Sequence, residues 1–261
     1  MKSFNYHSAK DSKEASKLSS SNSAFLAGGM TTIPSMKLGL ASYKDIIDIK
    51  GIKKLSGIKV SGKSVIIGAT TKHVEVANSK DVKKAIPSLA LLAEGIGDPQ
   101  VRNRGTIGGS IANNDPSADY PSACIALDAI VHTNERKIEA SKFFKGMFET
   151  ALKKGELIEA IEFKVPEKSS YQKHPNPASR YAVVGVYVAK HKNGTIVAVT
   201  GAKPCVYNDK DLSKALDSNF SANSISGMKL KSSDMNSDIH ASAEYRANLV
   251  VIQAKKAVEA C

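Results

Sequence analysis

The stretch GDPQVRNRGTIGGSIANNDPSADYP, residues 97–121, concentrates glycines, prolines and polar side chains in a way that an ordinary core helix or strand does not. Its centre is a glycine-rich loop, Gly105-Thr106-Ile107-Gly108-Gly109-Ser110. A second such loop, Ala27-Gly28-Gly29-Met30-Thr31-Thr32, follows the apolar run Ala24-Phe25-Leu26. Consecutive glycines let backbone N–H groups converge on one point without an intervening Cβ, and such a nest binds anions, phosphate above all.

Two interpretations of these loops stay open from the residues alone, a structural turn and a site for a diphosphate. Hydroxyl groups at Thr31, Thr32, Thr106 and Ser110 would add neutral donors to such a site. Neither loop matches the patterns GxxxxGK[ST] or GxGxxG, so we do not expect a P-loop or a Rossmann nucleotide site.

The segment that follows, ANNDPSADYP, also has two interpretations. Asp115 before Pro116 predicts a helix N-cap with proline at the first helical position, and Asp119 would then lie in the first turn and complement the helix dipole. Alternatively, Asn113, Asn114 and Asp119 hydrogen-bond the sugar or ribityl hydroxyls of a ligand beside the phosphates.

Helix and strand patterns alternate along the chain without regular βαβ order, which predicts an α+β fold. We expect a short polar helix within residues 8–20, strands in residues 24–27, 44–52, 60–71 and 155–165, a helix starting at Pro87 and a last helix in residues 241–260. The two β-rich runs around Asn193-Gly194 predict a hairpin with a type I′ turn. The polar segment EKSSYQKHPNPAS, residues 167–179, is interpreted as a linker, and we place a domain boundary there.

The composition excludes several classes of function. The net charge of +12 comes from scattered lysines without an arginine-rich run, so a solvated surface is favoured over a nucleic-acid site. The three cysteines form no CxxC pair, the six histidines have no metal-binding spacing, and no apolar stretch is long enough for a membrane span. We therefore expect a cytoplasmic protein. A chain that grips a diphosphate without a catalytic acid, base or nucleophile would take its chemistry from a cofactor.

Five segments together carry a resemblance to a known family. They are AGGMTTIPSMKLGLA, IGDPQVRNRGTIGGSIANNDPSADYPSA, GELIEAIEFKVP, ASRYAVVGVYVA and AEYRANL, in the family's order and over nearly the whole chain. The sequence resembles the FAD-binding medium subunit of the carbon monoxide dehydrogenase branch of the xanthine dehydrogenase family, the molybdenum hydroxylases.

The resemblance implies a two-lobed FAD-binding domain of the vanillyl-alcohol oxidase (PCMH) type and a smaller C-terminal α+β domain with an antiparallel sheet. We expect the FAD-binding domain in residues 1–168, with lobes of about 1–55 and 56–168, and the C-terminal flavoprotein domain in residues 169–261. The implied partners are a large molybdopterin subunit and a small subunit with two [2Fe–2S] clusters. Electrons would pass from the clusters through FAD to quinone, NAD or another acceptor.

The resemblance also implies the residues that contact FAD. They are Ala27, Gly28, Gly29, Met30, Thr31, Thr32, Thr106, Ile107, Gly108, Gly109 and Ser110 at the diphosphate, Asn113 and Asp119 near the diphosphate and the flavin sugar, Leu157 and Ile158 beside the cofactor, and Tyr181 at the isoalloxazine ring. Met30 departs from the family, which often has a polar residue at this position, so a side-chain hydrogen bond to the phosphate is not expected there.

Two other functions stay open at this point. One is a flavin oxidase that works without partner subunits, and the other is a basic nucleic-acid-binding module that would show steep salt dependence. A copurifying iron–sulfur subunit distinguishes the electron-transfer subunit from the oxidase, and a yellow cofactor distinguishes both from the binding module.

Overall fold

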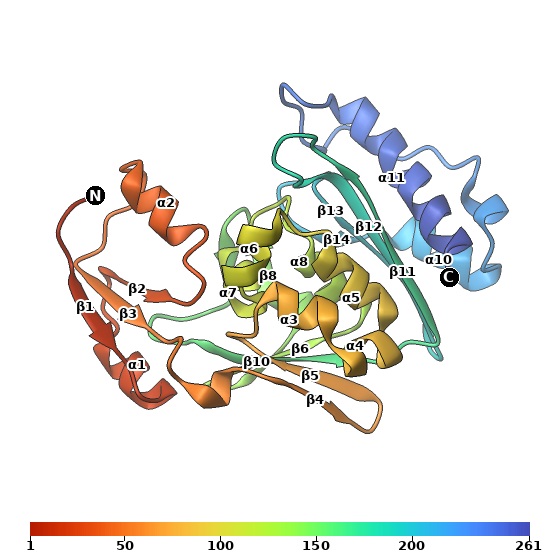
Figure 1. Cartoon of the computed structure of the whole chain (residues 1–261). Helices are drawn as coiled ribbons and strands as arrows, with labels where there is room; N and C mark the ends of the chain where they lie inside the picture. The colour runs from red at the N-terminus through yellow and green to blue at the C-terminus, as the bar shows by residue number, and fades with distance from the viewer.

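The computed structural model describes residues 1–261 and has an α+β fold with three main sheets (Figure 1). The first sheet has the strand order β1-β3-β2, the second β4-β5-β10-β6-β7 and the third β11-β12-β13-β14. The strands of the first sheet run parallel, whereas all neighbours in the other two are antiparallel. This mixture follows the α+β prediction.

The N-terminal part is a small layer of its own at the left of Figure 1. Its elements are β1 (Asn5–Ser8), α1 (Ser12–Leu18), β2 (Ser23–Leu26), α2 (Thr32–Lys37) and β3 (Asp45–Asp48). The side chain of Asp11 caps α1 by accepting a hydrogen bond from the Glu14 N–H at 2.8 Å. The predicted helix in residues 8–20 and the strands around Phe25 and Ile47 are confirmed, although β2 is only half-buried.

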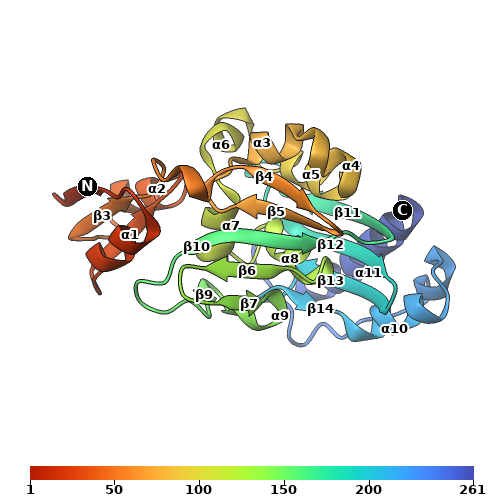
Figure 2. The ribbon, with the colours of Figure 1, turned by 90° about the horizontal axis from the view of Figure 1, so that it is seen from below.

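The middle part packs helices against the second sheet, with β10 in its centre (Figure 2). Its strands are β4 (Ile58–Ser61), β5 (Ser64–Gly68), β6 (Ile130–Thr133), β7 (Lys137–Glu139) and β10 (Ile158–Lys164), with a separate ribbon of β8 (Phe144–Gly146) and β9 (Glu149–Thr150). Its helices are α3 (His73–Asn78), α4 (Lys80–Ala85), α5 (Pro87–Glu94), α6 (Pro99–Arg104), α7 (Ile107–Asn113), α8 (Tyr120–Ala126) and α9 (Ala140–Phe143). The helix predicted from Pro87 is α5, and the strand predicted before Pro166 is β10.

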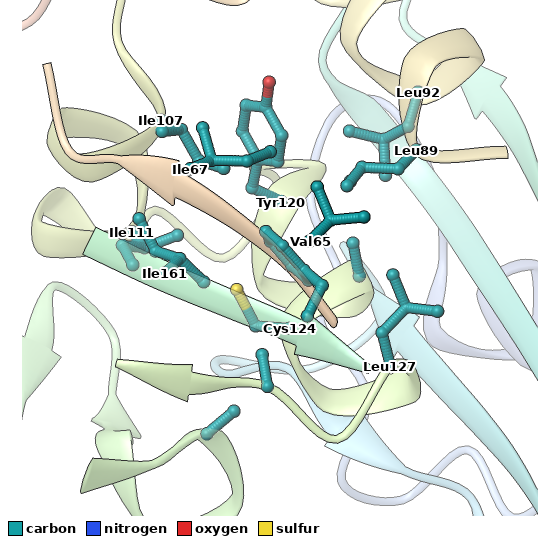
Figure 3. Close-up of a cluster of buried hydrophobic side chains, with 14 of the residues drawn as sticks. Val65, Ile67, Leu89, Leu92, Ile107, Ile111, Tyr120, Cys124, Leu127 and Ile161 are labelled. Carbon is teal, nitrogen blue, oxygen red and sulfur yellow. The ribbon is translucent and has the colours of Figure 1, made fainter. Parts of the chain in front are cut away.

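Figure 3 shows the main hydrophobic core between this sheet and its helices. Val65 and Ile67 of β5 and Ile161 of β10 meet Ile107 and Ile111 of α7 there, all fully buried. Alternate residues of a strand point to one face, which is why Val65 and Ile67 share this core. The core therefore fixes α7, the helix that begins in the second glycine-rich loop.

The C-terminal part consists of β11 (Lys168–Pro175), β12 (Ala182–His191), β13 (Gly194–Thr200), β14 (Tyr207–Asn208), α10 (Lys210–Ser218) and α11 (Ala243–Glu259). Helices α10 and α11 cover one face of its sheet, and α5 and α8 pack against the strands from the other side (Figure 1). Because both faces are covered, the first eight residues of β12 are all buried.

The linker prediction for residues 167–179 is wrong, because most of this segment forms strand β11. Its polar sequence gives no apolar alternation, and its strand structure comes from pairing with residues 182–190 of β12, with one bulge near His174 and Pro175. The Tyr171 ring packs at 5.9 Å from the Tyr187 ring across this pairing. Tertiary contacts therefore decide this element.

The hairpin of β12 and β13 is confirmed, but its predicted type I′ turn is wrong. His191 pairs with Gly194, so the two turn residues are Lys192 and Asn193, and neither has the positive φ that a type I′ turn requires. Only Gly194, after the turn, has a positive φ of 136°.

The helix predicted from Asp115 begins instead at Tyr120. In a helix from Asp115, the Pro116 carbonyl would accept a hydrogen bond from an N–H group of the same helix. Instead, the Gly201 N–H at 2.7 Å and the Thr200 hydroxyl at 2.9 Å donate to that oxygen. The Asp115 carboxylate accepts only from the Ser117 N–H, within a tight turn. Contacts with the end of β13 therefore displace the helix start.

None of the helices combines the length and the apolar composition that crossing a membrane requires.

Candidate functional site

The predicted cofactor-contacting residues gather around one cavity of about 490 Å³ between the N-terminal layer, the middle part and the segment before β12. All of them line this cavity except Ile107, whose side chain is fully buried in the main core (Figure 3). The volume of the cavity lies within the range of known ligand-binding cavities. Residues far apart in the sequence thus form one concave site.

The first glycine-rich loop, residues 27–32, offers the cavity a run of unpaired backbone donors. No N–H group from Ala27 to Thr32 has a hydrogen-bond acceptor in the chain. Helix α2 starts at Thr32, and its N-cap Thr31 makes no side-chain capping bond. Such donors are satisfied only by water or by a ligand, and an anion suits them best.

The second loop is not a turn, because it forms the first turn of α7. The N–H groups at and before its glycine pair already have partners, since Ile107 donates to the Thr71 carbonyl at 3.1 Å and Gly108 to the Ala69 carbonyl at 2.8 Å. Gly109 donates to the hydroxyl of the N-cap Thr106 at 3.2 Å. This loop therefore contributes to the wall of the cavity without a free run of donors.

Gly108 is required by packing. A Cβ at this position would lie 2.5 Å from the Ala69 Cβ and 2.7 Å from the Ala69 carbonyl oxygen. Only a glycine lets α7 come so close to the end of β5. A side chain at Gly109, by contrast, would meet only the Thr106 hydroxyl, at 3.0 Å.

The two loops touch each other at Gly28. A Cβ on Gly28 would overlap the Arg104 carbonyl oxygen and lie 2.9 Å from the Gly105 Cα. Behind this contact, a Cβ on Gly105 would lie 2.6 Å from Nε2 of His73. The N-terminal layer and the middle part therefore meet backbone to backbone at the cavity.

His73 lies in the cavity wall behind this contact and is 4% exposed. Burial, helped by the positive charge of Arg102, lowers the pKa of His73 to about 4, so the imidazole is neutral at pH 7. Its Nδ1 has no hydrogen-bond partner in the chain. The Tyr120 ring lies nearby, with a centroid distance of 5.4 Å to the His73 ring, and the Tyr120 hydroxyl has no partner either. An unpaired buried polar atom beside a cavity fits a site whose ligand or water completes the bonding.

Asp119 precedes α8, and the third sheet holds its carboxylate in the cavity wall. Oδ1 accepts a hydrogen bond from the Tyr171 hydroxyl, and Oδ2 lies 3.1 Å from Nζ of Lys173. Burial raises the pKa of Asp119, although Lys173 and Tyr171 oppose this effect. A carboxylate has about four acceptor positions, so two are left for hydroxyl groups of a ligand.

Asn113 and Asn114 have different environments. Asn113 lines the cavity. Asn114 is 1% exposed with a left-handed φ of 44°, and its Nδ2 donates to the carbonyls of Gly146 at 2.7 Å and Glu149 at 2.8 Å. The alternative that Asn114 binds sugar hydroxyls is therefore wrong, because its amide holds the β8–β9 ribbon.

Glu156 precedes Leu157 and Ile158 and fixes their place in the wall. Its fully buried carboxylate binds Nε of Arg136 at 2.9 Å, Nη2 of Arg136 at 3.0 Å and the Lys153 N–H at 2.9 Å. Burial acts to raise the pKa of Glu156, but these bonds and the one from Thr133 outweigh it and lower the pKa to about 2. The bidentate ion pair therefore anchors the segment that leads into β10.

Tyr181 lines the cavity from the segment between β11 and β12 and is 45% exposed. Burial and the charges of Asp115 and Asp119 raise the pKa of Tyr181, so its hydroxyl is protonated at pH 7. The ring belongs to the C-terminal part and reaches a cavity that the other two parts build.

Sequence reasoning missed His73, Glu156 and Lys173. Their signals in the sequence are weak: His73 follows the end of a buried strand, Glu156 opens a strand pattern, and Lys173 lies in the segment interpreted as a linker. The chain has no cluster of three or more His, Cys, Asp or Glu side chains that could hold a metal ion.

Comparison with known proteins gives consistent matches. The profile of the family described as "FAD binding domain in molybdopterin dehydrogenase" matches residues 2–167. The chain is 37% identical over 207 residues to the carbon monoxide dehydrogenase medium chain of Hydrogenophaga pseudoflava, which covers 75% of this chain and 71% of that protein. It is 38% identical over 194 residues to the glyceraldehyde dehydrogenase medium chain of Sulfolobus acidocaldarius, 71% of this chain and 69% of that one.

Among solved structures, the fold is similar to a chain of carbon monoxide dehydrogenase from Hydrogenophaga pseudoflava, in a form that lacks the Mo-pyranopterin moiety of its molybdenum cofactor. The TM-score is 0.89 at 31% sequence identity, over 99% of this chain and 97% of that one. The similarity thus extends beyond the family match into the C-terminal part.

Proposed function

This chain belongs to the family of FAD-binding domains in molybdopterin dehydrogenases, and we propose that it is the electron-transfer subunit of a molybdenum-containing hydroxylase or dehydrogenase. Electrons would come from the [2Fe–2S] clusters of a partner subunit and leave through FAD to an external acceptor. The family membership supports the role as a subunit of a molybdenum enzyme, and the geometry of the cavity supports the binding of FAD.

Three properties follow from the family. FAD is the cofactor, the protein is a subunit of an oxidoreductase, and the fold is the two-lobed PCMH type with a C-terminal domain that contains an antiparallel sheet. The FAD-binding domain is proposed to span residues 1–168, with lobes of about 1–55 and 56–168, and the C-terminal domain residues 169–261.

The observation that carries the proposal is the run of unpaired N–H groups from Ala27 to Thr32, in a loop that lines a cavity of about 490 Å³. A diphosphate supplies the acceptors that these donors lack, and backbone donors need no positive side chain to bind it. Asp119 offers free acceptor positions for hydroxyl groups of the sugar or ribityl chain. The residues present therefore fit FAD.

The role of the chain's own residues would be to bind and orient FAD. The first loop would hold the diphosphate, and the adjoining second loop would form part of the wall through Thr106, Gly109 and Ser110. Leu157, Ile158 and Tyr181 would border the ring system. Bound FAD supplies the electron-transfer chemistry. Asp119 and Glu156 are each paired with a cation, and His73 is neutral with a pKa of about 4. A third carboxylate of the wall, Asp115, accepts a hydrogen bond only from the Ser117 N–H. An electron-transfer subunit is favoured over a flavin oxidase that works alone because the relatives are medium chains of dehydrogenases.

The proposed partners are a large molybdopterin subunit and a small [2Fe–2S] subunit in a cytoplasmic hetero-oligomer, with quinone or NAD as the acceptor. The medium-chain relatives support this proposal, because their names place them in carbon monoxide and glyceraldehyde dehydrogenases. The substrate of the whole enzyme would be chosen outside this chain.

The first test is an absorption spectrum of the purified chain before and after addition of FAD, with the heat-released cofactor identified by chromatography. We expect flavin absorption and release of FAD at about one per chain. The proposal is contradicted if the protein stays colourless with excess FAD and still binds no FAD after the [2Fe–2S] and molybdopterin subunits are added.

A second test separates the alternatives. Coexpression with [2Fe–2S] and molybdopterin subunits of the same family should yield a copurifying complex that reduces the flavin of this chain. Flavin reduction by a small substrate without any partner would indicate a self-sufficient oxidase. Salt-sensitive binding of nucleic acid without flavin would indicate a binding module.

A further inference from the structure

Lys173 of β11 joins three separate segments beside the cavity. Its ammonium group donates to the Gly95 carbonyl at 2.8 Å, to the Arg180 carbonyl at 3.0 Å and to Asp119 Oδ2 at 3.1 Å. A lysine has three N–H donors, so all three are used. The side chains of Lys173 and Asp119 are only 11% and 5% exposed. The ammonium is therefore a fully bonded charge in a largely buried place.

One of the three segments is the turn that carries Tyr181. The turn is closed by two bonds of 2.8 Å, from the Asn176 N–H to the Tyr181 carbonyl and from the Arg180 N–H to the Asn176 carbonyl. Arg180 has a positive φ of 62°, which only surrounding contacts sustain in a residue with a side chain. The turn has a defined shape, but its own bonds do not fix it to the cavity.

Two contacts fix the turn to the cavity wall. Lys173 binds the Arg180 carbonyl, and the Arg180 guanidinium donates to the Gly97 carbonyl at 3.1 Å. Both contacts lead to residues 95–97, of which Ile96 and Gly97 line the cavity. The turn, the end of α5 and Asp119 are thus joined through one ammonium group.

We propose that Lys173 is a positioning residue that holds the Asn176–Tyr181 turn, and with it the Tyr181 ring, against the cavity, so that retention of FAD depends on the C-terminal sheet. This inference rests on the proposed function for its FAD part. Lys173 does not need to touch the cofactor, because it acts through Tyr181 and Asp119. It also explains why a strand with a polar sequence lies beside a cofactor cavity.

The test compares Lys173→Met with Lys192→Met in the full chain. Both variants lose one positive charge from the C-terminal part, but Lys192 lies in the exposed turn of the β12–β13 hairpin. Hydrogen–deuterium exchange of the peptide that contains residues 176–181 measures how firmly the turn is held, and a fluorescence titration measures the FAD dissociation constant. For Lys173→Met we expect exchange to accelerate and the dissociation constant to rise by about tenfold. Lys192→Met should change neither.

Lys173→Met leaves the Asp119 carboxylate buried without its cation, which destabilises the fold. The double variant Lys173→Met/Asp119→Asn removes both charges and keeps the side-chain volumes close to the original. Its turn should exchange faster than the turn of Asp119→Asn alone, which retains Lys173.

Each outcome decides a separate point. Unchanged exchange in Lys173→Met, or faster exchange with an unchanged FAD dissociation constant, overturns the proposed role of Lys173 and leaves the proposed function standing. Failure of the wild-type chain to bind FAD counts against the proposed function, and the exchange measurement still decides whether Lys173 holds the turn.

Discussion

The two glycine-rich loops have the same sequence signal and use it differently. Both contain two consecutive glycines after an apolar residue, with hydroxyl side chains nearby. In the first loop no N–H group from Ala27 to Thr32 is paired, whereas in the second the N–H groups of Ile107, Gly108 and Gly109 all donate within the chain. A glycine pair therefore predicts close approach of something to the backbone, and the hydrogen-bond partners decide whether that is a ligand or another part of the protein.

The difference follows from what precedes each helix. Thr106 caps α7 with its side chain, and the Ala69 carbonyl accepts the Gly108 N–H, so the glycine pair of the second loop is fully hydrogen-bonded without a ligand. Thr31 makes no capping bond, and α2 is short and lies outside the main core. The first loop is therefore the part of the site that a ligand completes.

Gly28→Ala should have the largest effect of single changes at the two loops. The added Cβ would overlap the Arg104 carbonyl oxygen, and backbone on both sides cannot yield as a flexible side chain does. We expect a loss of ~3 kcal/mol in the free energy of unfolding, since overpacking at this level costs that much, and loss of FAD binding because the N-terminal layer moves away from the cavity. Denaturant unfolding measures the loss of stability, and FAD titration measures the loss of binding. A destabilised Gly28→Ala variant that keeps full FAD affinity would show that FAD binding does not need the contact at Gly28.

Gly108→Ala tests the second loop. Its Cβ would meet Ala69, and we expect ~2 kcal/mol of destabilisation but normal FAD stoichiometry in the folded fraction.

Two further variants sharpen this test. Ala69→Gly in the Gly108→Ala background removes the nearest clashing atom, the Ala69 Cβ, and should restore part of the stability. Gly109→Ala, where a Cβ meets only the Thr106 hydroxyl, should cost little. Equal destabilisation by Gly108→Ala and Gly109→Ala would contradict the packing explanation.

His73 behind the contact of the loops makes stability depend on pH. Its pKa in the folded chain is about 4, below the ordinary value of 6.5 in the unfolded chain, so the unfolded state binds more protons between these values. Stability should fall by roughly 2 kcal/mol from pH 7 to pH 5 through this residue. His73→Gln should remove this part of the pH dependence, whereas His240→Asn, at an exposed position, should keep it. A pH profile that His73→Gln leaves unchanged would rule the explanation out.

The sequence predicted the helices and strands whose own residues show a clear periodicity or clear boundary residues. The helix at Pro87, the strand before Pro166, the β12–β13 hairpin and the last helix all have clear periodicity or turn residues, and the structure has them. Residues 168–175 have no such signal, because Ser170 and Tyr171 become strand only through pairing with β12. The start of α8 was misplaced because the Pro116 carbonyl is bound by the distant Thr200 and Gly201.

The candidate site shows the same division. The loops were found because glycine pairs are local, and Tyr181 came from the family resemblance. Lys173 could not be found, because its three acceptors, at residues 95, 119 and 180, are brought together only by the fold. Glu156 was missed for a related reason, since a glutamate at the start of a strand pattern is usually exposed, and only the distant Arg136 makes its burial favourable.

The smallest effects should come from the two threonines that precede the helices. Thr106→Ala removes the hydroxyl that accepts the Gly109 N–H and should cost ~1 kcal/mol of stability, the usual value of an N-cap. Thr31→Ala removes no capping bond and should change stability by less than ~0.5 kcal/mol. For FAD affinity we expect the reverse order, with Thr31→Ala weakening binding more, because its hydroxyl belongs to the loop whose donors are free. Paired measurements of unfolding free energy and FAD dissociation constant would show this crossing, and a Thr106→Ala variant that loses more affinity than Thr31→Ala would mean that the second loop, not the first, holds the diphosphate.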